Sequence, residues 1–234
     1  MSQFYCDAQL SEGKEFSFDE KESAHLKVFR VKKGEKIKVF SPWGRYIAEI
    51  SDFRERKVIA RVLAKLPEGK KDFKIKLYFS FIEKSAFEEV FRKGTETGCD
   101  IFIPLICEYT QKNHILDMEE KMERFNEIIF SSVKQCERSD IPQIAPPVKF
   151  NEIFVLEKRP IIFSKTDAHG LPAQPVSSLR VQQEAALVIG PEGGFSPSEI
   201  SLANGRADFI SLGQNVLRSQ TAAALACAIL RALK

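Results

Sequence analysis

The hydrophobic pattern of this chain changes near residue 70. Before that point, short segments alternate polar and apolar residues, which is typical of half-buried antiparallel strands. Residues 36–40 and 45–50 flank Ser41-Pro42-Trp43-Gly44, where proline and glycine favour a tight turn. Residues 58–64 offer a third strand. Strands this close together predict a small β-barrel over residues 1–68.

A different pattern follows over residues 72–234. The stretch 67–72 is polar and contains proline and glycine, which predicts a joint between two domains. Apolar runs predict buried strands at 76–81, 101–105, 160–163, 186–189 and 207–212. Amphipathic stripes predict a helix that begins at a capping box on Ser85 and ends near Gly98, and another over 118–134. Strands that alternate with helices predict an α/β fold with a mostly parallel sheet covered on both faces.

Two loops that contain glycine follow predicted strands. Gly190-Pro191-Glu192-Gly193-Gly194 follows 186–189, and Gly213 follows 207–212. Glycine lets the backbone approach a ligand, helix N-termini offer unpaired N–H groups, and ligands of parallel sheets bind at the carboxyl ends of strands. Either loop alone could be a tight turn without a ligand, but the two together favour one small-molecule site.

The residues of these loops narrow the class of ligand. The patterns GxxxxGK[ST] and GxGxxG are absent, and Glu192 would repel a phosphate. A ligand with adenine, ribose hydroxyls and a cationic centre fits better, because backbone groups can bind an adenine edge and Glu192 can accept from hydroxyls or lie near a positive charge. S-adenosylmethionine has all of these groups. Arg218 and Thr221, at the start of a last helix, are expected to face the site.

Composition restricts the class of protein further. The net charge is only +3, which excludes an extended basic field but allows a local basic patch. Five cysteines without a CxxC pair predict reduced thiols rather than disulfides or a zinc ribbon. The first residues lack the pattern of a signal peptide, and no apolar stretch approaches the roughly 20 residues that span a bilayer. We therefore expect a cytoplasmic protein with no membrane contact and, because its three histidines are scattered, no metal.

Several motifs together resemble one known family, the RsmE-type 16S rRNA (uridine-N3) methyltransferases of the SPOUT superfamily. The motifs that carry the resemblance are Gly190-Pro191-Glu192-Gly193-Gly194-Phe195, Leu212-Gly213, Leu217-Arg218 with Thr221-Ala222, His25-Leu26-Lys27-Val28-Phe29-Arg30 with Gly34, Lys84, residues 93–98, and Arg124, Gln135, Arg138, Ile141 and Pro142. The chain departs from the family at Thr97, where leucine is usual, at Glu108-Tyr109-Thr110, where Glu-Arg-Ser is usual, and at residues 133–135.

The resemblance implies a fold, a cofactor and a substrate. The fold is a SPOUT-type, trefoil-knotted domain over residues 72–234 with a smaller PUA-like barrel that binds RNA over 1–68. The partners are 16S rRNA or the small ribosomal subunit and a second copy in a homodimer. The residues implied to bind S-adenosylmethionine are Ile189, Gly190, Pro191, Glu192, Gly193, Leu212, Gly213, Val216, Leu217, Arg218 and Thr221. Those implied to bind RNA are Arg30, Lys32, Lys33 and Arg138.

The implied reaction moves a methyl group to N3 of a uridine. N3 carries a weakly acidic imide proton that must leave, to solvent or to an assisting group, so the enzyme should stabilise the uracil anion. Arg218 is the first candidate for this role and Arg138 the second. The alternative for Arg138 is an ion pair with Glu137 or Asp140. N3 lies on the pairing edge, so the target base should be unpaired or extruded.

Two other functions stay open at this stage. One is a non-catalytic RNA-binding factor of ribosome assembly. The other is a knotted methyltransferase that acts on a ribose 2′-OH or on a tRNA base.

Overall fold

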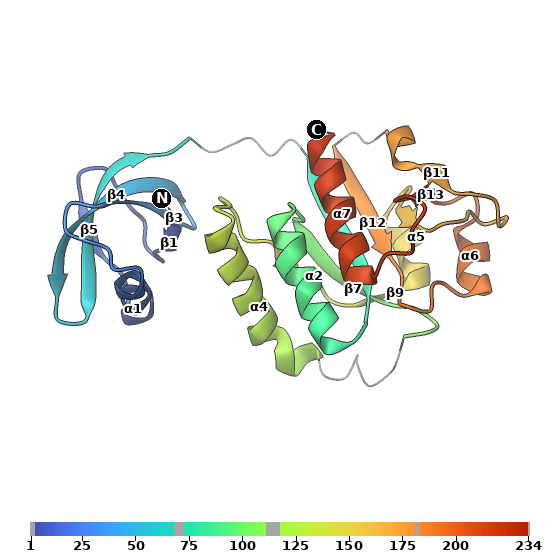
Figure 1. Ribbon diagram of the computed structural model, residues 1–234, viewed down its shortest axis with the longest axis horizontal. Helices are drawn as coiled ribbons and strands as arrows, with labels where there is room; N and C mark the ends of the chain where they lie inside the picture. The colour runs from blue at the N-terminus through green and yellow to red at the C-terminus, as the bar shows by residue number, and fades with distance from the viewer. Residues whose placement is uncertain (1–2, 68–72, 111–117, 181–182, 234) are drawn as a thin grey trace. The chain divides into compact units, whose positions relative to one another are not determined.

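The computed structural model describes residues 3–67, 73–110, 118–180 and 183–233 (Figure 1). The chain forms two compact units. The first comprises Met1–Lys70 with Val133–Asp140, and the second comprises Lys71–Ser132 with Ile141–Lys234. Residues 68–72 of the predicted joint lie outside the described residues. Within the described residues, none of the helices has the length and apolar character needed to cross a bilayer.

The first unit contains one five-stranded sheet in the order β1-β3-β4-β5-β2, with one helix against it. Its elements are β1 (Gln3–Tyr5), β2 (Glu15–Ser17), α1 (Glu20–Val28), β3 (Lys36–Ser41), β4 (Gly44–Arg54) and β5 (Lys57–Lys65). The predicted hairpin is confirmed, because Ser41 pairs with Gly44 across a two-residue turn. Phe4, Phe18 and Leu26 lie fully buried in its core.

A closed barrel is not confirmed for this unit. The strands β1 and β2 form the two edges of the sheet and, in the described part of the chain, do not pair with each other. Each has only three residues, which leaves few backbone groups that could close the sheet. The unit is therefore described as an open, mostly antiparallel sheet.

Residues 133–140 belong to this first unit although they are remote from it in sequence. The side-chain amide of Gln3 donates to the backbone carbonyl of Arg138 at 2.8 Å. Lys38 forms an ion pair with Glu137, and Lys134 forms one with the buried carboxylate of Glu22 at 2.9 Å. These contacts attach the segment to the sheet.

The second unit contains an eight-stranded sheet in which every described pair of strands is parallel. The strand order is β11-β13-β10-β12-β6-β7-β8, and β9 also pairs with β7. Its strands are β6 (Lys74–Ser80), β7 (Ile101–Ile106), β8 (Gln143–Ile144), β9 (Val148–Lys149), β10 (Ile161–Phe163), β11 (Gln174–Pro175), β12 (Glu184–Ile189) and β13 (Asp208–Ser211). The predicted α/β class with a parallel sheet is confirmed.

Helices cover both faces of this sheet. They are α2 (Lys84–Glu96), α4 (Met118–Gln135), the 3-10 helix η1 (Phe150–Glu152), α5 (Ile153–Leu156), the 3-10 helix η2 (Val176–Ser178), α6 (Pro197–Ala203) and α7 (Ser219–Ala232). On one face, α2 and α7 pack against each other, and α7 contacts β6 and β12 (Figure 1). The other face packs against η1, α5 and α6.

Alternate residues of the strands supply the two cores. Phe79 of β6 contacts Phe87 and Phe91 of α2, and Phe91 stacks on Phe125 of α4 with ring centroids 4.8 Å apart. The neighbouring residue, Tyr78, points to the other core. Burial on both faces explains why these strands appear in the sequence as nearly continuous apolar runs.

One helix boundary differs from the sequence prediction. Ser85 does not cap α2, because the cap is Glu83, whose carboxylate accepts from the N–H groups of Ser85 and Ala86. A carboxylate placed two residues earlier satisfies these donors and also complements the positive end of the helix. The predicted end is confirmed, since Gly98 follows the last turn with φ +99°.

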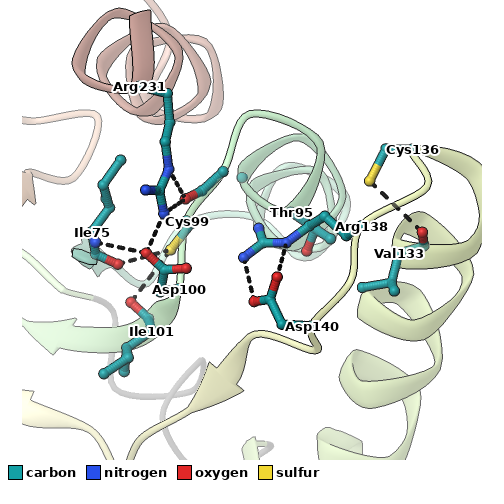
Figure 2. A network of polar contacts seen from close by, with 12 residues as sticks. Ile75, Thr95, Cys99, Asp100, Ile101, Val133, Cys136, Arg138, Asp140 and Arg231 are labelled. Atoms are coloured by element: carbon teal, nitrogen blue, oxygen red, sulfur yellow. Dashed lines mark hydrogen bonds and ion pairs between the residues drawn. The ribbon is translucent and has the colours of Figure 1, made fainter. Parts of the chain in front are cut away.

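The C-terminal end of α7 is fixed at the edge of the sheet opposite the carboxyl ends of its strands. The guanidinium of Arg231 donates to the backbone carbonyl of Gly98 at 2.7 and 2.9 Å and to that of Phe73 at 2.7 Å. It also forms an ion pair with Asp100 (Figure 2). Asp100 in turn accepts from the N–H of Ile75 at 2.8 Å. This network ties the last helix to the starts of β6 and β7.

Candidate functional site

The first glycine loop leaves the carboxyl end of β12 and leads into α6. Gly194 has φ +75°, a conformation that favours glycine, and its N–H donates to the carbonyl of Pro191 at 2.9 Å. A Cβ on Gly190 would lie 3.0 Å from the ring of Phe195. Glycine at 190 therefore lets Phe195 pack under the loop, and glycine at 194 lets the loop turn.

A capping box closes the end of this loop, where α6 begins. The hydroxyl of Ser196 accepts from the N–H of Glu199 at 3.2 Å, and the carboxylate of Glu199 accepts from the N–H of Ser196 at 2.8 Å. Glu199 is buried, and its second oxygen accepts from the N–H of Glu108 at 2.8 Å. One buried carboxylate thus connects the first glycine loop to the segment that follows β7.

Residues 107–110 form that connected segment. The hydroxyl of Ser198 donates to the carboxylate of Glu108 at 2.6 Å, and the hydrogen bonds from Ser196 and Ser198 hold the pKa of Glu108 below its usual range. Burial raises the pKa of the Cys107 thiol, and the nearby Glu199 raises it further. Cys107 is therefore an inert packed thiol rather than a nucleophile.

The second glycine loop joins β13 to α7. Gly213 has φ +124°, and a Cβ built there would have no atom within 4 Å. The Ser211 hydroxyl accepts from the N–H of Gly213 at 3.2 Å and donates to its carbonyl at 3.0 Å. Arg218 is the N-cap residue of α7, but its side chain makes no capping bond. The loop is therefore held by Ser211, whereas the side chain of Arg218 is exposed.

These two loops and a third segment enclose a cavity of about 550 Å³. The third segment is the carboxyl end of β10, which lies between β12 and β13 in the sheet. The residues that line the cavity are Phe163, Ser164, Lys165, Thr166, Ile189, Gly190, Pro191, Glu192, Gly194, Phe195, Ile200, Ser211, Leu212, Gly213, Asn215, Val216, Leu217, Arg218, Ser219 and Ala222. The volume lies within the range of about 300–1,000 Å³ that is usual for small-molecule sites.

The structure brings most of the predicted cofactor residues to this cavity. Those that line it are Ile189, Gly190, Pro191, Glu192, Leu212, Gly213, Val216, Leu217 and Arg218, whereas Gly193 and Thr221 are absent from its lining. Gly193 faces Tyr109 instead, because a Cβ there would lie 3.8 Å from that ring. That the predicted cofactor residues bind S-adenosylmethionine stays a prediction.

The segment 163–166 also lines the cavity, although the sequence motifs did not predict it as part of the site. Lys165 is exposed and is the only cation besides Arg218 in the lining, which also contains the carboxylate of Glu192. A signal for it was present, because 160–163 already reads as a buried parallel strand whose carboxyl end must share an edge with the glycine loops. Across the described residues, no three His, Cys, Asp or Glu side chains gather as a metal site would require.

The predicted RNA-binding residues lie in the first unit. Arg30, Lys32 and Lys33 are exposed in the turn after α1, and Arg30 has φ +54°. Arg138 forms an ion pair with Asp140 at 2.8 Å, and its side chain is only 11% exposed. The ion-pair alternative is therefore present for Arg138 (Figure 2). Glu137, the other candidate partner, pairs with Lys38.

Comparison with known proteins gives consistent matches over most of the chain. A curated relative from Synechocystis, named ribosomal RNA small subunit methyltransferase E, is 29% identical and aligns over 88% of this chain and 69% of its own. A relative of the same name from Rickettsia conorii is 24% identical over 99% of this chain and 96% of its own.

Solved structures resemble the chain over nearly its whole length. A candidate methyltransferase from Legionella pneumophila, in complex with the bound cofactor SAM, has a TM-score of 0.83 at 29% identity and covers 99% of this chain and 97% of its own. The ribosomal RNA small subunit methyltransferase E of Neisseria gonorrhoeae has a TM-score of 0.84 at 24% identity, with 100% and 98% coverage, which shows a shared fold. The model of the RNA methyltransferase domain matches residues 69–231, more than half of the sequence and the whole of the cavity. The chain therefore belongs to the RNA methyltransferase family that this domain defines.

Proposed function

We propose that the protein transfers a methyl group from S-adenosylmethionine to N3 of a specific uridine in 16S rRNA of the small ribosomal subunit. The observation that carries the proposal is the cavity between the two glycine loops, in a chain that belongs to the RNA methyltransferase family. The names of the curated relatives support the rRNA substrate. The Legionella structure, solved with the cofactor SAM, supports the methyl donor.

The residues of the cavity fit that donor. The backbone is open at Gly213, where a Cβ would meet no atom within 4 Å, so the backbone groups of the second loop are accessible to an adenine edge. Glu192 can accept from ribose hydroxyls or lie near the sulfonium, and Lys165 can attract the carboxylate of the methionine part. The bound donor would supply an electrophilic methyl group.

The chain's own contribution to the reaction is to align N3 and to stabilise the uracil anion. Arg218 suits the second task, because it lines the cavity, its side chain is exposed and it has no ion pair within the described residues. An arginine keeps its charge at any working pH. The imide proton leaves to solvent or to an assisting group, and the positive charge of Arg218 stabilises the uracil anion that forms. We assign no catalytic role to Arg138, which is paired with Asp140.

The proposal includes the rest of the predicted architecture. Residues 1–68 act as a PUA-like domain that binds RNA phosphates through Arg30, Lys32 and Lys33, and residues 72–234 act as the methyltransferase domain. The chain leaves β13 on one side of β10 and returns as α7 against β6 and β12, a path that is compatible with the SPOUT knot. We also propose that the protein acts as a homodimer, as its resemblance to the RsmE-type family implies.

The experiment that tests this function is methylation of intact small subunits and of free 16S rRNA with labelled donor, followed by mass spectrometry of the nucleosides. We expect 3-methyluridine. A 2′-O-methyl product, or a modified tRNA, would favour the related knotted activities instead. No cofactor binding in calorimetry at millimolar donor would contradict the proposal.

A variant distinguishes an enzyme from an RNA-binding assembly factor. Arg218→Ala should lower kcat by about 10²- to 10³-fold, the usual effect of removing one donor to a developing anion, while the affinity for RNA stays within twofold. Arg206→Ala is a matched control, because Arg206 lies over the ring of Phe154 and outside the cavity lining. If Arg218→Ala keeps full activity, another residue must stabilise the anion.

A further inference from the structure

An exposed aromatic side chain lies beside the first glycine loop, outside the cavity lining. Tyr109 follows β7 and is 51% exposed. In the described residues, its hydroxyl and its ring have no hydrogen bond, ion pair or ring contact. The ring of Tyr109 therefore presents an apolar surface next to the cavity, and this surface could bind a ligand.

The backbone that carries this ring is tightly held. The N–H of Cys107 donates to the hydroxyl of Thr110 at 2.8 Å, and the N–H of Thr110 donates to the carbonyl of Cys107 at 3.0 Å. Thr110 also shares a hydrogen bond of 3.1 Å with Ser80 at the end of β6. With Glu108 bound to Glu199 and Ser198, Tyr109 has fixed residues on both sides. A ring on a rigid turn loses little conformational entropy when a ligand stacks on it.

The ring lies against the same turn that lines the cavity. A Cβ on Gly193 would be 3.8 Å from Cδ2 and 3.9 Å from Cβ of Tyr109. The residues on each side of Gly193, Glu192 and Gly194, both line the cavity. The ring of Tyr109 therefore contacts the one residue of the turn Glu192–Gly194 that does not line the cavity.

A base that reacts in this cavity must leave its stack in the RNA. Extrusion from a helix removes its stacking partners, and RNA-binding proteins commonly replace them with aromatic side chains. We propose that Tyr109 is a stacking platform for an unpaired base of the RNA substrate and helps to deliver the target uridine to the cavity. This inference rests on the proposed function, and it assigns to Tyr109 a positioning role rather than a catalytic one.

The role of the ring is testable with Tyr109→Leu and Tyr109→Phe in the full chain. Base stacking on an aromatic residue contributes about 1–3 kcal/mol, so Tyr109→Leu should raise the KM for RNA by about five- to 150-fold. The Kd for S-adenosylmethionine and the Tm should change little, because the side chain is about half exposed, lies outside the cavity lining and makes no polar contact in the described residues. Tyr109→Phe keeps the ring and should match the wild type.

Three results would overturn the inference. One is an unchanged KM for RNA in Tyr109→Leu. Another is a weaker affinity for the donor in that variant, which would mean that the ring supports the Gly193 turn. The third is loss of RNA affinity in Tyr109→Phe, which would assign the effect to the hydroxyl. Failure of the proposed function is a separate outcome, because the wild type would then form no 3-methyluridine. The affinities of the wild type, Tyr109→Leu and Tyr109→Phe for RNA would still show whether the ring binds a base.

Discussion

The hydroxyl of Ser219 donates a hydrogen bond of 3.1 Å to the backbone carbonyl of Gly190. Ser219 is the first residue of α7, and Gly190 is the first residue after β12. This bond joins the two glycine loops, which are otherwise separate connections from different strands. This bond therefore helps to set the width of the cavity between them, together with the packing of α7 against β12.

Ser219→Ala should weaken binding of the methyl donor without unfolding the protein. A typical hydrogen bond contributes about 0.5–1.5 kcal/mol, so the Kd measured by calorimetry should rise by about two- to tenfold. Ser219→Thr keeps a hydroxyl and should retain most of the affinity. Equal losses in both variants would mean that the size of the side chain, rather than the bond, sets the affinity.

Arg231 and Asp100 should contribute to stability and not to activity. Arg231→Met removes the ion pair to the carboxylate of Asp100, whose side chain is 10% exposed, and also removes the donors to Gly98 and Phe73. Breaking a buried pair costs about 3–5 kcal/mol, and with Arg231 one quarter exposed we expect about 2–4 kcal/mol in urea unfolding.

A double-mutant cycle with Asp100→Asn isolates the pair. The two effects should be strongly non-additive, because each substitution removes the same interaction. Methyl transfer at low temperature should stay near that of the wild type, since the network lies at the end of α7 remote from its first turn. Additive effects would show that Arg231 stabilises the fold mainly through its hydrogen bonds to the backbone carbonyls of Gly98 and Phe73.

Local patterns predict much of this fold. The apolar runs around Leu77, Ile103 and Val188 predict buried strands because parallel strands covered on both faces need them. The glycine loops were found because their backbone conformations, such as that of Gly194, require glycine. The cap at Glu83 was missed because glutamate is a less usual N-cap than serine and because Ser85 and Glu88 have the spacing of a capping box.

Long-range pairing explains what the sequence could not predict. Strand order is a property of the whole fold, so nothing local shows that β10 lies between β12 and β13 and adds Lys165 to the cavity. For the same reason, residues 133–140 could not be assigned to the first unit, because Gln3 reaches across more than a hundred residues to Arg138. Thr221, in the first turn of α7, was expected to face the cavity but is absent from its lining.

The carboxylate of Glu108 should make stability depend on pH in acid. Hydrogen bonds from Ser196 and Ser198 lower its pKa in the folded protein below the usual 4.5. The stabilisation is therefore present above pH 4.5 and is lost as pH falls through the lower folded pKa. Glu108→Gln should lower the Tm at pH 7, and the difference from the wild type should shrink as the pH approaches 3.

A matched control for Glu108 is Glu55→Gln, in the exposed turn between β4 and β5. Its Tm should differ little from that of the wild type at any pH. If the Tm difference for Glu108→Gln stays constant from pH 7 to pH 3, the glutamine destabilises the protein because its amide fits poorly, and not because the negative charge is lost.

Arg30 should combine a cost in stability with a gain in RNA binding. It has φ +54° directly after α1, where its N–H bonds to Lys27 and the next N–H bonds to Leu26, a helix ending that normally uses glycine. The left-handed conformation costs a non-glycine residue about 1–2 kcal/mol. Strain of this kind persists at functional sites, and an exposed arginine can bind RNA phosphate.

Arg30→Gly should therefore raise the free energy of unfolding by about 1 kcal/mol and weaken RNA binding. Glu55→Gly is the matched control, because Glu55 has φ +50° in the turn between β4 and β5 and should gain similar stability without losing RNA affinity. The measurements are urea unfolding and RNA titration at several salt concentrations, in which Arg30→Gly should reduce the salt slope by about one phosphate contact. Equal RNA affinity in the two variants would leave the strain at Arg30 without a function in RNA binding.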